Sequence, residues 1–280
     1  MLPTVEIFGR TVGTYGICAA VGFLCMLLCV ALLARRRDMN PDLMVVMALV
    51  SFVGVAVGAV LLYGITNIPT MVQVVADWRA GAYDTPGAFA AALVSCFSGF
   101  VFYGGLIGGL TVCCVYARRR RWNVPEVLDV FAVAVPLFHV FGRIGCFLGG
   151  CCYGVEADWG FVYTDAPVAS SNGVPRVPVQ LIEAACNAVL FAVLLGLFLK
   201  GRMRGGLVGV YGLAYAVVRF VDEFWRGDEY RGIWGPFSTS QWISIAVAVA
   251  AVCYLVAFRR KRRREGPTLA ECGFSVQQGL

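Results

Sequence analysis

Charged residues are scarce in this 280-residue chain, at 14% of the total, whereas 59% of the residues are hydrophobic. A soluble domain carries about 25% charged residues, so this chain has too few charges to cover the surface of a soluble fold. Disorder is excluded as well, because disordered chains are poor in aromatic residues and this chain is 13% aromatic. The many short alternating strands of an outer-membrane barrel are also missing. The composition therefore indicates an all-α protein that is integral to a membrane.

Seven apolar segments are long enough to cross a membrane, which takes about 20 mostly apolar residues. They are residues 13–34, 43–64, 88–117, 127–147, 179–199, 206–225 and 238–258. We therefore expect a polytopic protein with seven transmembrane helices. Residues 1–258 are predicted to form a single transmembrane domain, and residues 259–280 a cytoplasmic tail.

The basic residues concentrate in four blocks, each beside an apolar segment, and the net charge is +6. The blocks fall within residues 35–37, 118–121, 200–204 and 259–264. Basic loops flanking transmembrane helices stay in the cytoplasm, so this placement favours membrane orientation over nucleic-acid binding. With seven helices all four blocks fall on one side. The N-terminus is then outside and the C-terminus in the cytoplasm.

Several ionisable residues lie inside or at the ends of the apolar segments, where they are costly and mark a candidate site. They are Arg143, Glu183, Arg219, Glu223 and Arg226. Arg219 and Glu223 are spaced i,i+4, so an ion pair within one helix is one interpretation. Arg143 has no such local partner. Because a guanidinium grips phosphate with two hydrogen bonds, the pattern favours a protein that handles an anionic lipid from the outer leaflet.

Three of the twelve cysteines, Cys146, Cys151 and Cys152, gather seven residues or more after His139, the only histidine. Thiolate and imidazole groups bind zinc or copper, but this spacing matches no common metal motif. A disulfide on the outer side of the membrane is a second possibility. We expect structural thiols and no bound metal.

Several pieces of sequence resemble one family. Residues 141–154, FGRIGCFLGGCCYG, resemble the signature G-R-x-x-N-F-x-N-x-E-x-x-G of the prolipoprotein diacylglyceryl transferases. Further pieces follow in the family's order, so that the resemblance runs over about residues 13–258. These pieces are Tyr15-Gly16, GGLIG at 104–108, PVQLIEA at 178–184, RFVDEFWR at 219–226 and Ser240-Gln241.

The resemblance implies a membrane enzyme that moves a diacylglyceryl group from phosphatidylglycerol to the lipobox cysteine thiol of a preprolipoprotein signal peptide. Glycerol phosphate is the leaving group. The family resemblance also implies the cytoplasmic membrane of a bacterium, an active site towards the outer face, and a reaction without metal or organic cofactor. The lipid bilayer is then a partner, and nucleic acid is not.

The resemblance also implies roles for particular residues. The catalytic set is Tyr103, His139, Arg143 and Arg219. The substrate-binding set is Tyr15, Gly104, Gly105, Arg143, Gly154, Gln180, Glu183, Glu223 and Arg226.

The chain departs from the family pattern at four positions. Cys146, Gly149 and Cys151 stand where the signature has asparagine, asparagine and glutamate. Tyr103 stands where the family has a histidine, its usual candidate for the base, and His139 is the alternative base. Three other functions stay open: transfer of a lipid group to another acceptor, binding of an anionic lipid without catalysis, and thiol redox chemistry at the outer face.

Overall fold

A computed structural model describes residues 1–227 and 232–265, and most of these residues are helical. The chain divides into two compact units, which we describe one at a time. Unit 1 comprises residues 1–37 together with residues 125–280, and unit 2 comprises residues 38–124.

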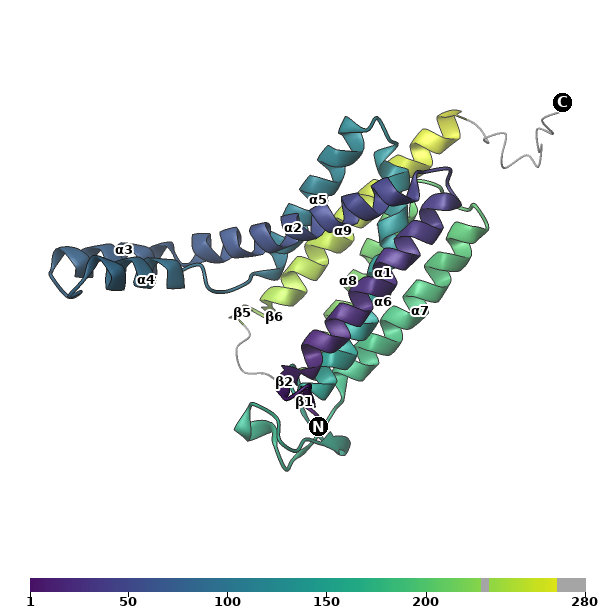
Figure 1. Ribbon diagram of the computed structural model, residues 1–280. Coiled ribbons are helices and arrows are strands. Elements are labelled where there is room, and N and C mark those ends of the chain that lie inside the picture. The colour runs from purple at the N-terminus through teal and green to yellow at the C-terminus, as the bar shows by residue number, and fades with distance from the viewer. Residues whose placement is uncertain (228–231, 266–280) are drawn as a thin grey trace. The chain divides into compact units, whose positions relative to one another are not determined.

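Unit 1 is built on five long helices that lie side by side (Figure 1). They are α1 (Thr14–Arg35), α6 (Val124–Leu148), α7 (Val179–Leu199), α8 (Leu207–Asp222) and α9 (Thr239–Glu265). Helix α8 packs against both α7 and α9. Helix α1 approaches α6 closely because Gly22 lies against Phe141, where a Cβ on the glycine would come within 2.6 Å of the Phe141 Cβ.

Short strands and turns gather at one end of this bundle (Figure 1). Three antiparallel pairs form there: β1 (Thr4–Ile7) with β2 (Arg10–Gly13), β3 (Glu156–Val162) with β4 (Pro175–Arg176), and β5 (Ile233–Trp234) with β6 (Phe237–Ser238). Two short 3₁₀ helices are η1 (Ala169–Ser171) and η2 (Glu223–Trp225). The sequence predicted no strand in these stretches, because strands this short give no clear alternation of polar and apolar residues. It also placed residues 223–225 in the span 206–225, whereas the α-helix ends at Asp222 and η2 follows.

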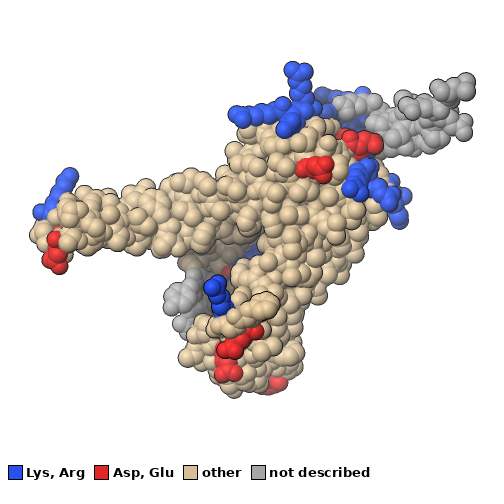
Figure 2. Space-filling model, viewed as in Figure 1, with Lys and Arg blue, Asp and Glu red and all other residues tan. Residues whose placement is uncertain are grey.

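The opposite end of the bundle is basic, and Lys and Arg side chains are visible there in Figure 2. Six basic residues line a cavity of about 600 Å³: Arg36, Arg37, Lys200, Arg202, Arg204 and Arg262. We call these six residues the basic end. They come from three of the four predicted blocks, so those three blocks share one end of unit 1. The membrane side that this end faces stays a prediction.

Unit 2 consists of α2 (Pro41–Thr66), α3 (Ile68–Arg79), α4 (Pro86–Ser95) and α5 (Phe102–Arg119). Helix α2 begins at a local signal, because the Asn40 side chain accepts a hydrogen bond from the Leu43 N–H and Pro41 follows it. Helices α2 and α5 pack backbone to backbone. A Cβ on Gly58 would lie 2.2 Å from the Gly104 carbonyl oxygen, which is the close approach that small residues permit.

The predicted span at residues 88–117 is wrong as a single helix, since α4 ends at Ser95 and α5 begins at Phe102. Serine hydroxyls compete for backbone carbonyls here, as the Ser98 hydroxyl donates to the Ser95 carbonyl oxygen at 2.7 Å. Gly99 then packs against the Tyr63 ring. A Cβ on Gly99 would lie 2.3 Å from the nearest ring carbon of Tyr63. Helix α3 also fills most of residues 65–87, which we expected to be a loop.

Five described helices are long and apolar enough to cross a membrane, namely α1, α2, α6, α7 and α9. Helix α5 has 18 residues and fills only the second part of the predicted span 88–117. Helix α8 has 16 residues and lies within the predicted span 206–225. The number seven and the orientation therefore remain predictions, as does the division into one domain and a tail, whose residues 266–280 lie outside the described part.

Candidate functional site

Arg143, which has no partner in its local sequence, pairs with an acid on another helix. Its Nη2 atom on α6 lies 2.9 Å from Glu183 Oε1 on α7. The Tyr215 hydroxyl on α8 donates to the same Glu183 oxygen at 3.3 Å. The Glu183 side chain is 2% exposed, whereas that of Arg143 is 20% exposed. Three helices thus fix one face of the guanidinium and leave part of it accessible to a ligand.

A second buried ion pair lies at the end of α8. Arg219 Nη2 is 2.7 Å from Glu223 Oε2, with the carboxylate side chain 2% exposed, so the i,i+4 pair predicted from the sequence is present. Arg219 also donates to the Ser240 hydroxyl on α9 at 3.1 Å. Buried charges at hydrogen-bond distance from an opposite charge avoid most of the cost of desolvation.

The two ion pairs belong to one electrostatic group, which also contains an acid that the sequence analysis left out of the site. Asp222 is 2% exposed and interacts electrostatically with Glu183, Arg219, Arg143 and Arg226. Its position next to Glu223 in the sequence was the available signal. We call Arg143, Glu183, Arg219, Asp222, Glu223 and Arg226 the charge cluster.

His139 lies one turn before Arg143 on α6 and is surrounded by tyrosines. Its Nδ1 atom is 3.4 Å from the Tyr211 hydroxyl oxygen, and its ring centroid is 5.3 Å from that of Tyr215. The structure thus brings His139 to the charge cluster through Tyr215, which contacts Glu183 as well. The sequence analysis missed both tyrosines, because nothing local marks them among the other aromatic residues.

Gln180 and Gly154 hold the loop that follows α6. The amide of Gln180, 1% exposed, accepts from the Tyr163 hydroxyl at 3.0 Å and donates to the Cys151 carbonyl oxygen at 2.7 Å. Gly154 forms a bridge with Arg226, and a Cβ there would lie 2.3 Å from the Val177 carbonyl oxygen. Both predicted substrate-binding residues thus have structural contacts that bring Cys151 and Arg226 close to the end of α6.

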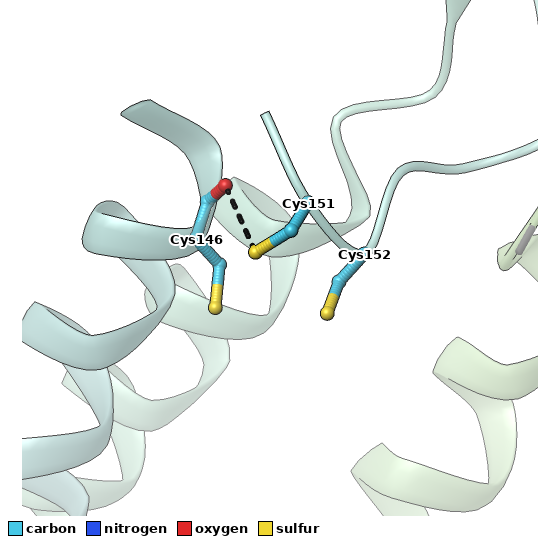
Figure 3. Close-up of side chains that lie close together, drawn as sticks. All are labelled: Cys146, Cys151 and Cys152. Carbon is cyan, nitrogen blue, oxygen red and sulfur yellow. Dashed lines mark hydrogen bonds between the residues drawn. The ribbon is translucent and has the colours of Figure 1, made fainter. Parts of the chain in front are cut away.

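The three signature cysteines converge at this point (Figure 3). Cys146 comes from the last turns of α6, and Cys151 and Cys152 from the loop after it. Their sulfur atoms all lie within 4.8 Å of one another, and no disulfide links them. Hydrogen bonding to Cys146 and Cys151 lowers the pKa of the Cys152 thiol, and the positive charges of Arg226 and Arg143 act in the same direction. We call these residues the thiol cluster.

Tyr15 lies at the start of α1, next to the end of α6. A Cβ on Gly145 would be 3.3 Å from the Tyr15 Cα, and the Tyr15 side chain is half exposed. Its phenol interacts electrostatically with Cys146, Cys151 and Arg143. Tyr15 therefore lies beside the thiol cluster, and its role in substrate binding stays a prediction.

Three predicted site residues, Tyr103, Gly104 and Gly105, belong to α5 in unit 2. Both glycines are buried against α2, and a Cβ on Gly105 would lie 3.0 Å from a Val55 methyl group. Within this unit the glycines serve close helix packing. The Tyr103 ring contacts that of Phe102 edge to face, with centroids 5.5 Å apart.

Comparison with known proteins agrees with the sequence resemblance. The family model described as prolipoprotein diacylglyceryl transferase matches residues 4–257. The chain is 33% identical over 249 residues to phosphatidylglycerol–prolipoprotein diacylglyceryl transferase of Clostridium tetani, covering 88% of this chain and 93% of that protein. It is 31% identical over 267 residues to transferase 2 of Clostridium perfringens, covering 93% and 96%. A Xanthomonas oryzae transferase is 38% identical over 146 residues, 46% of this chain and 49% of that protein.

Proposed function

The chain belongs to the prolipoprotein diacylglyceryl transferase family, and we propose that it transfers a diacylglyceryl group from phosphatidylglycerol to a prolipoprotein. In this reaction the acceptor cysteine thiol loses its proton and its sulfur attacks the diacylglyceryl carbon. A carbon–sulfur bond forms, the carbon–oxygen bond to the phosphate breaks, and glycerol phosphate leaves. The acceptor is the lipobox cysteine of the signal peptide.

The observation that carries this proposal is the partly accessible Arg143 guanidinium, held from behind by the buried Glu183 carboxylate at 2.9 Å. A fixed guanidinium presents two parallel N–H donors, which match two phosphate oxygens. Donors that are already oriented stabilise the charge that develops on a leaving phosphate, because no reorganisation is needed at the moment of reaction. Arg219 and Arg226 add positive charge from the end of α8.

The substrate has further contacts in this proposal. Tyr15, Gly154 and Gln180 border the lipid headgroup from α1, from the loop after α6 and from the start of α7, while Glu183 and Glu223 orient the arginines. The proton of the acceptor thiol, whose ordinary pKa is about 8.5, passes to His139 or to Tyr103. Their substitution, described in the Discussion, decides between the two.

The protein is a multi-pass membrane protein, and we place it in the cytoplasmic membrane of a bacterium. In this placement the basic end lies in the cytoplasm, because basic flanking loops are retained there. The charge cluster and thiol cluster then lie towards the outer face, where a translocated signal peptide and outer-leaflet phosphatidylglycerol meet.

The test is an assay with the purified full-length protein in phosphatidylglycerol vesicles and a lipobox peptide. We expect glycerol phosphate release that requires the peptide, together with a peptide mass increased by one diacylglyceryl group. Retention of lipid without release would instead indicate a lipid-binding protein. Release with an acceptor other than the peptide would indicate a different transferase. Restored lipoprotein lipidation in cells depleted of their own transferase provides the matching test in vivo.

A further inference from the structure

The thiol cluster has the geometry of a metal site, although its spacing in the sequence matches no common metal motif. The three sulfur atoms lie within 4.8 Å of one another. With zinc–sulfur bonds of about 2.3 Å, two thiolates on one tetrahedral zinc ion are about 3.8 Å apart. The three side chains therefore need only small movements to share one ion, and Figure 3 shows their sulfur atoms around a common space.

The backbone holds the three thiols in this arrangement. The Cys151 N–H donates to the Cys146 carbonyl oxygen at 3.1 Å, and Gln180 holds the Cys151 carbonyl oxygen at 2.7 Å. Gly150 and Cys152 both have positive φ angles, +70° and +59°. A non-glycine residue in this region is strained, and such strain gathers at functional sites. The positive φ angle at Cys152 turns the backbone, and the Cys152 thiol lies near that of Cys146.

The surroundings suit an ion held by thiolates. Three thiolates around a divalent ion carry a net charge of −1, and Arg143 and Arg226 both interact electrostatically with Cys152. Soft thiolate ligands select zinc or monovalent copper over calcium and magnesium. Among the described residues, the thiol cluster supplies three ligands. The fourth position of a tetrahedral ion is then taken by water or by a ligand.

We propose that Cys146, Cys151 and Cys152 form a three-thiolate binding site for zinc, with one coordination position open. On binding, each thiol releases its proton to solvent as its sulfur coordinates the ion. The proposal concerns metal binding alone, so it stands or fails independently of the transferase activity.

The test uses the full-length protein, purified in detergent, reduced and freed of metal. Titration with Zn²⁺ against a chromophoric chelator should give one tightly bound ion per chain, and Co²⁺ should give a sulfur-to-cobalt charge-transfer band. Serine at all three positions of the thiol cluster should abolish both signals. The matched control replaces Cys25, Cys29 and Cys253, which lie outside the cluster, and should retain both signals.

A second measurement needs no variant and so does not depend on the folding of one. In the wild-type protein, Zn²⁺ should protect Cys146, Cys151 and Cys152 from alkylation by a maleimide, as read by peptide mass spectrometry, while Cys253 stays reactive. Equal alkylation with and without Zn²⁺ would overturn the proposal. So would equal zinc binding by the cluster and control variants, or a disulfide within the cluster that persists after treatment with the reductant.

Discussion

Arginine residues are concentrated at both ends of unit 1, but the surroundings of their charges differ. At the charge cluster, Arg143 and Arg219 each lie within 3 Å of a carboxylate that is almost completely buried. At the basic end, six cations surround one cavity of about 600 Å³, and Arg204 among them lies 3.8 Å from a Glu126 carboxylate that is 26% exposed. Charges of both signs held together out of water mark a site, whereas charges of one sign at a helix end mark membrane orientation.

Arg37 shows what a buried cation does without such pairing. It is 7% exposed, and its guanidinium lies 4.3 Å from the Phe198 ring centroid. Burial lowers the pKa of Arg37, and the positive charge of Arg204 acts in the same direction. An aromatic face and distant acids thus stand in for the direct carboxylate contact that Arg143 has. The two ends therefore differ in how close and how buried their carboxylates are: 2.7–2.9 Å and 2% exposed at the charge cluster, against 3.8 Å and 26% exposed for Glu126 beside Arg204 at the basic end.

The largest effect is expected on removing the negative charge from the Arg143 pair. Glu183→Gln keeps the shape of the side chain but leaves Arg143, which is 20% exposed, without its buried counter-charge. Breaking a buried pair in this way costs about 3–5 kcal/mol, so thermal unfolding in detergent should occur at a clearly lower temperature. Glu156→Gln is the matched control, because Glu156 is 65% exposed and pairs with Arg176 at 3.4 Å. Equal unfolding temperatures of the two variants would mean that the buried Arg143–Glu183 pair stabilises the fold no more than the exposed Arg176–Glu156 pair.

The next effect concerns the shape of the cation at the site. Arg143→Lys keeps the charge but loses the planar fork that holds two phosphate oxygens. The activation free energy of transfer should rise by at least about 2 kcal/mol, which lowers the rate roughly 30-fold. This is close to the effect of losing one oxyanion donor. Arg204→Lys makes the same change at the basic end and should leave the rate unchanged. Near-normal turnover of Arg143→Lys would mean that Arg143 supplies only a general positive charge.

A third pair of substitutions separates the two candidates for the base. General acid–base catalysis contributes about 10²–10⁴-fold. If His139 accepts the thiol proton, His139→Gln should lower the rate with little change in unfolding temperature, and Tyr103→Phe should matter less. If the Tyr103 hydroxyl orients the headgroup instead, the ranking reverses. We favour Tyr103, since it occupies the position of the family's histidine. Unchanged rates in both variants would leave the arginines as the only activators of the thiol.

The sequence predicted the helical class and most helix positions because runs of about 20 apolar residues are a strong local signal. It failed at residues 88–117, where the apolar run continues through the break between α4 and α5. That break depends on contacts with α2, such as Gly99 against Tyr63. A contact with a partner more than 30 positions away leaves no periodic trace in the local sequence.

The sequence revealed single residues of the site but not the contacts between them. Ionisable residues in apolar segments stand out individually, so Arg143, Glu183 and Arg219 were found. The pairing of Arg143 with Glu183 was not predicted, because these residues are 40 positions apart and lie on different helices. The thiol cluster was judged by its spacing along the chain. The turn with positive φ at Gly150 and Cys152 that brings the sulfur atoms together appears only in three dimensions.

The smallest effect on activity is expected at the basic end, although this end decides the orientation of the protein. Arg202 is exposed, so Arg202→Cys should change the transfer rate by no more than about twofold, as for most surface substitutions. A membrane-impermeant maleimide should not label this cysteine, or one introduced at Arg119, in intact cells. Cysteines introduced at Asp84 and Asp158 should be labelled, because their segments are predicted to lie outside. The unsubstituted chain corrects for native cysteines, and permeabilised cells confirm that positions 119 and 202 are reactive. Labelling of position 202 in intact cells would reverse the orientation of unit 1 and place the charge cluster on the cytoplasmic side, away from a translocated acceptor.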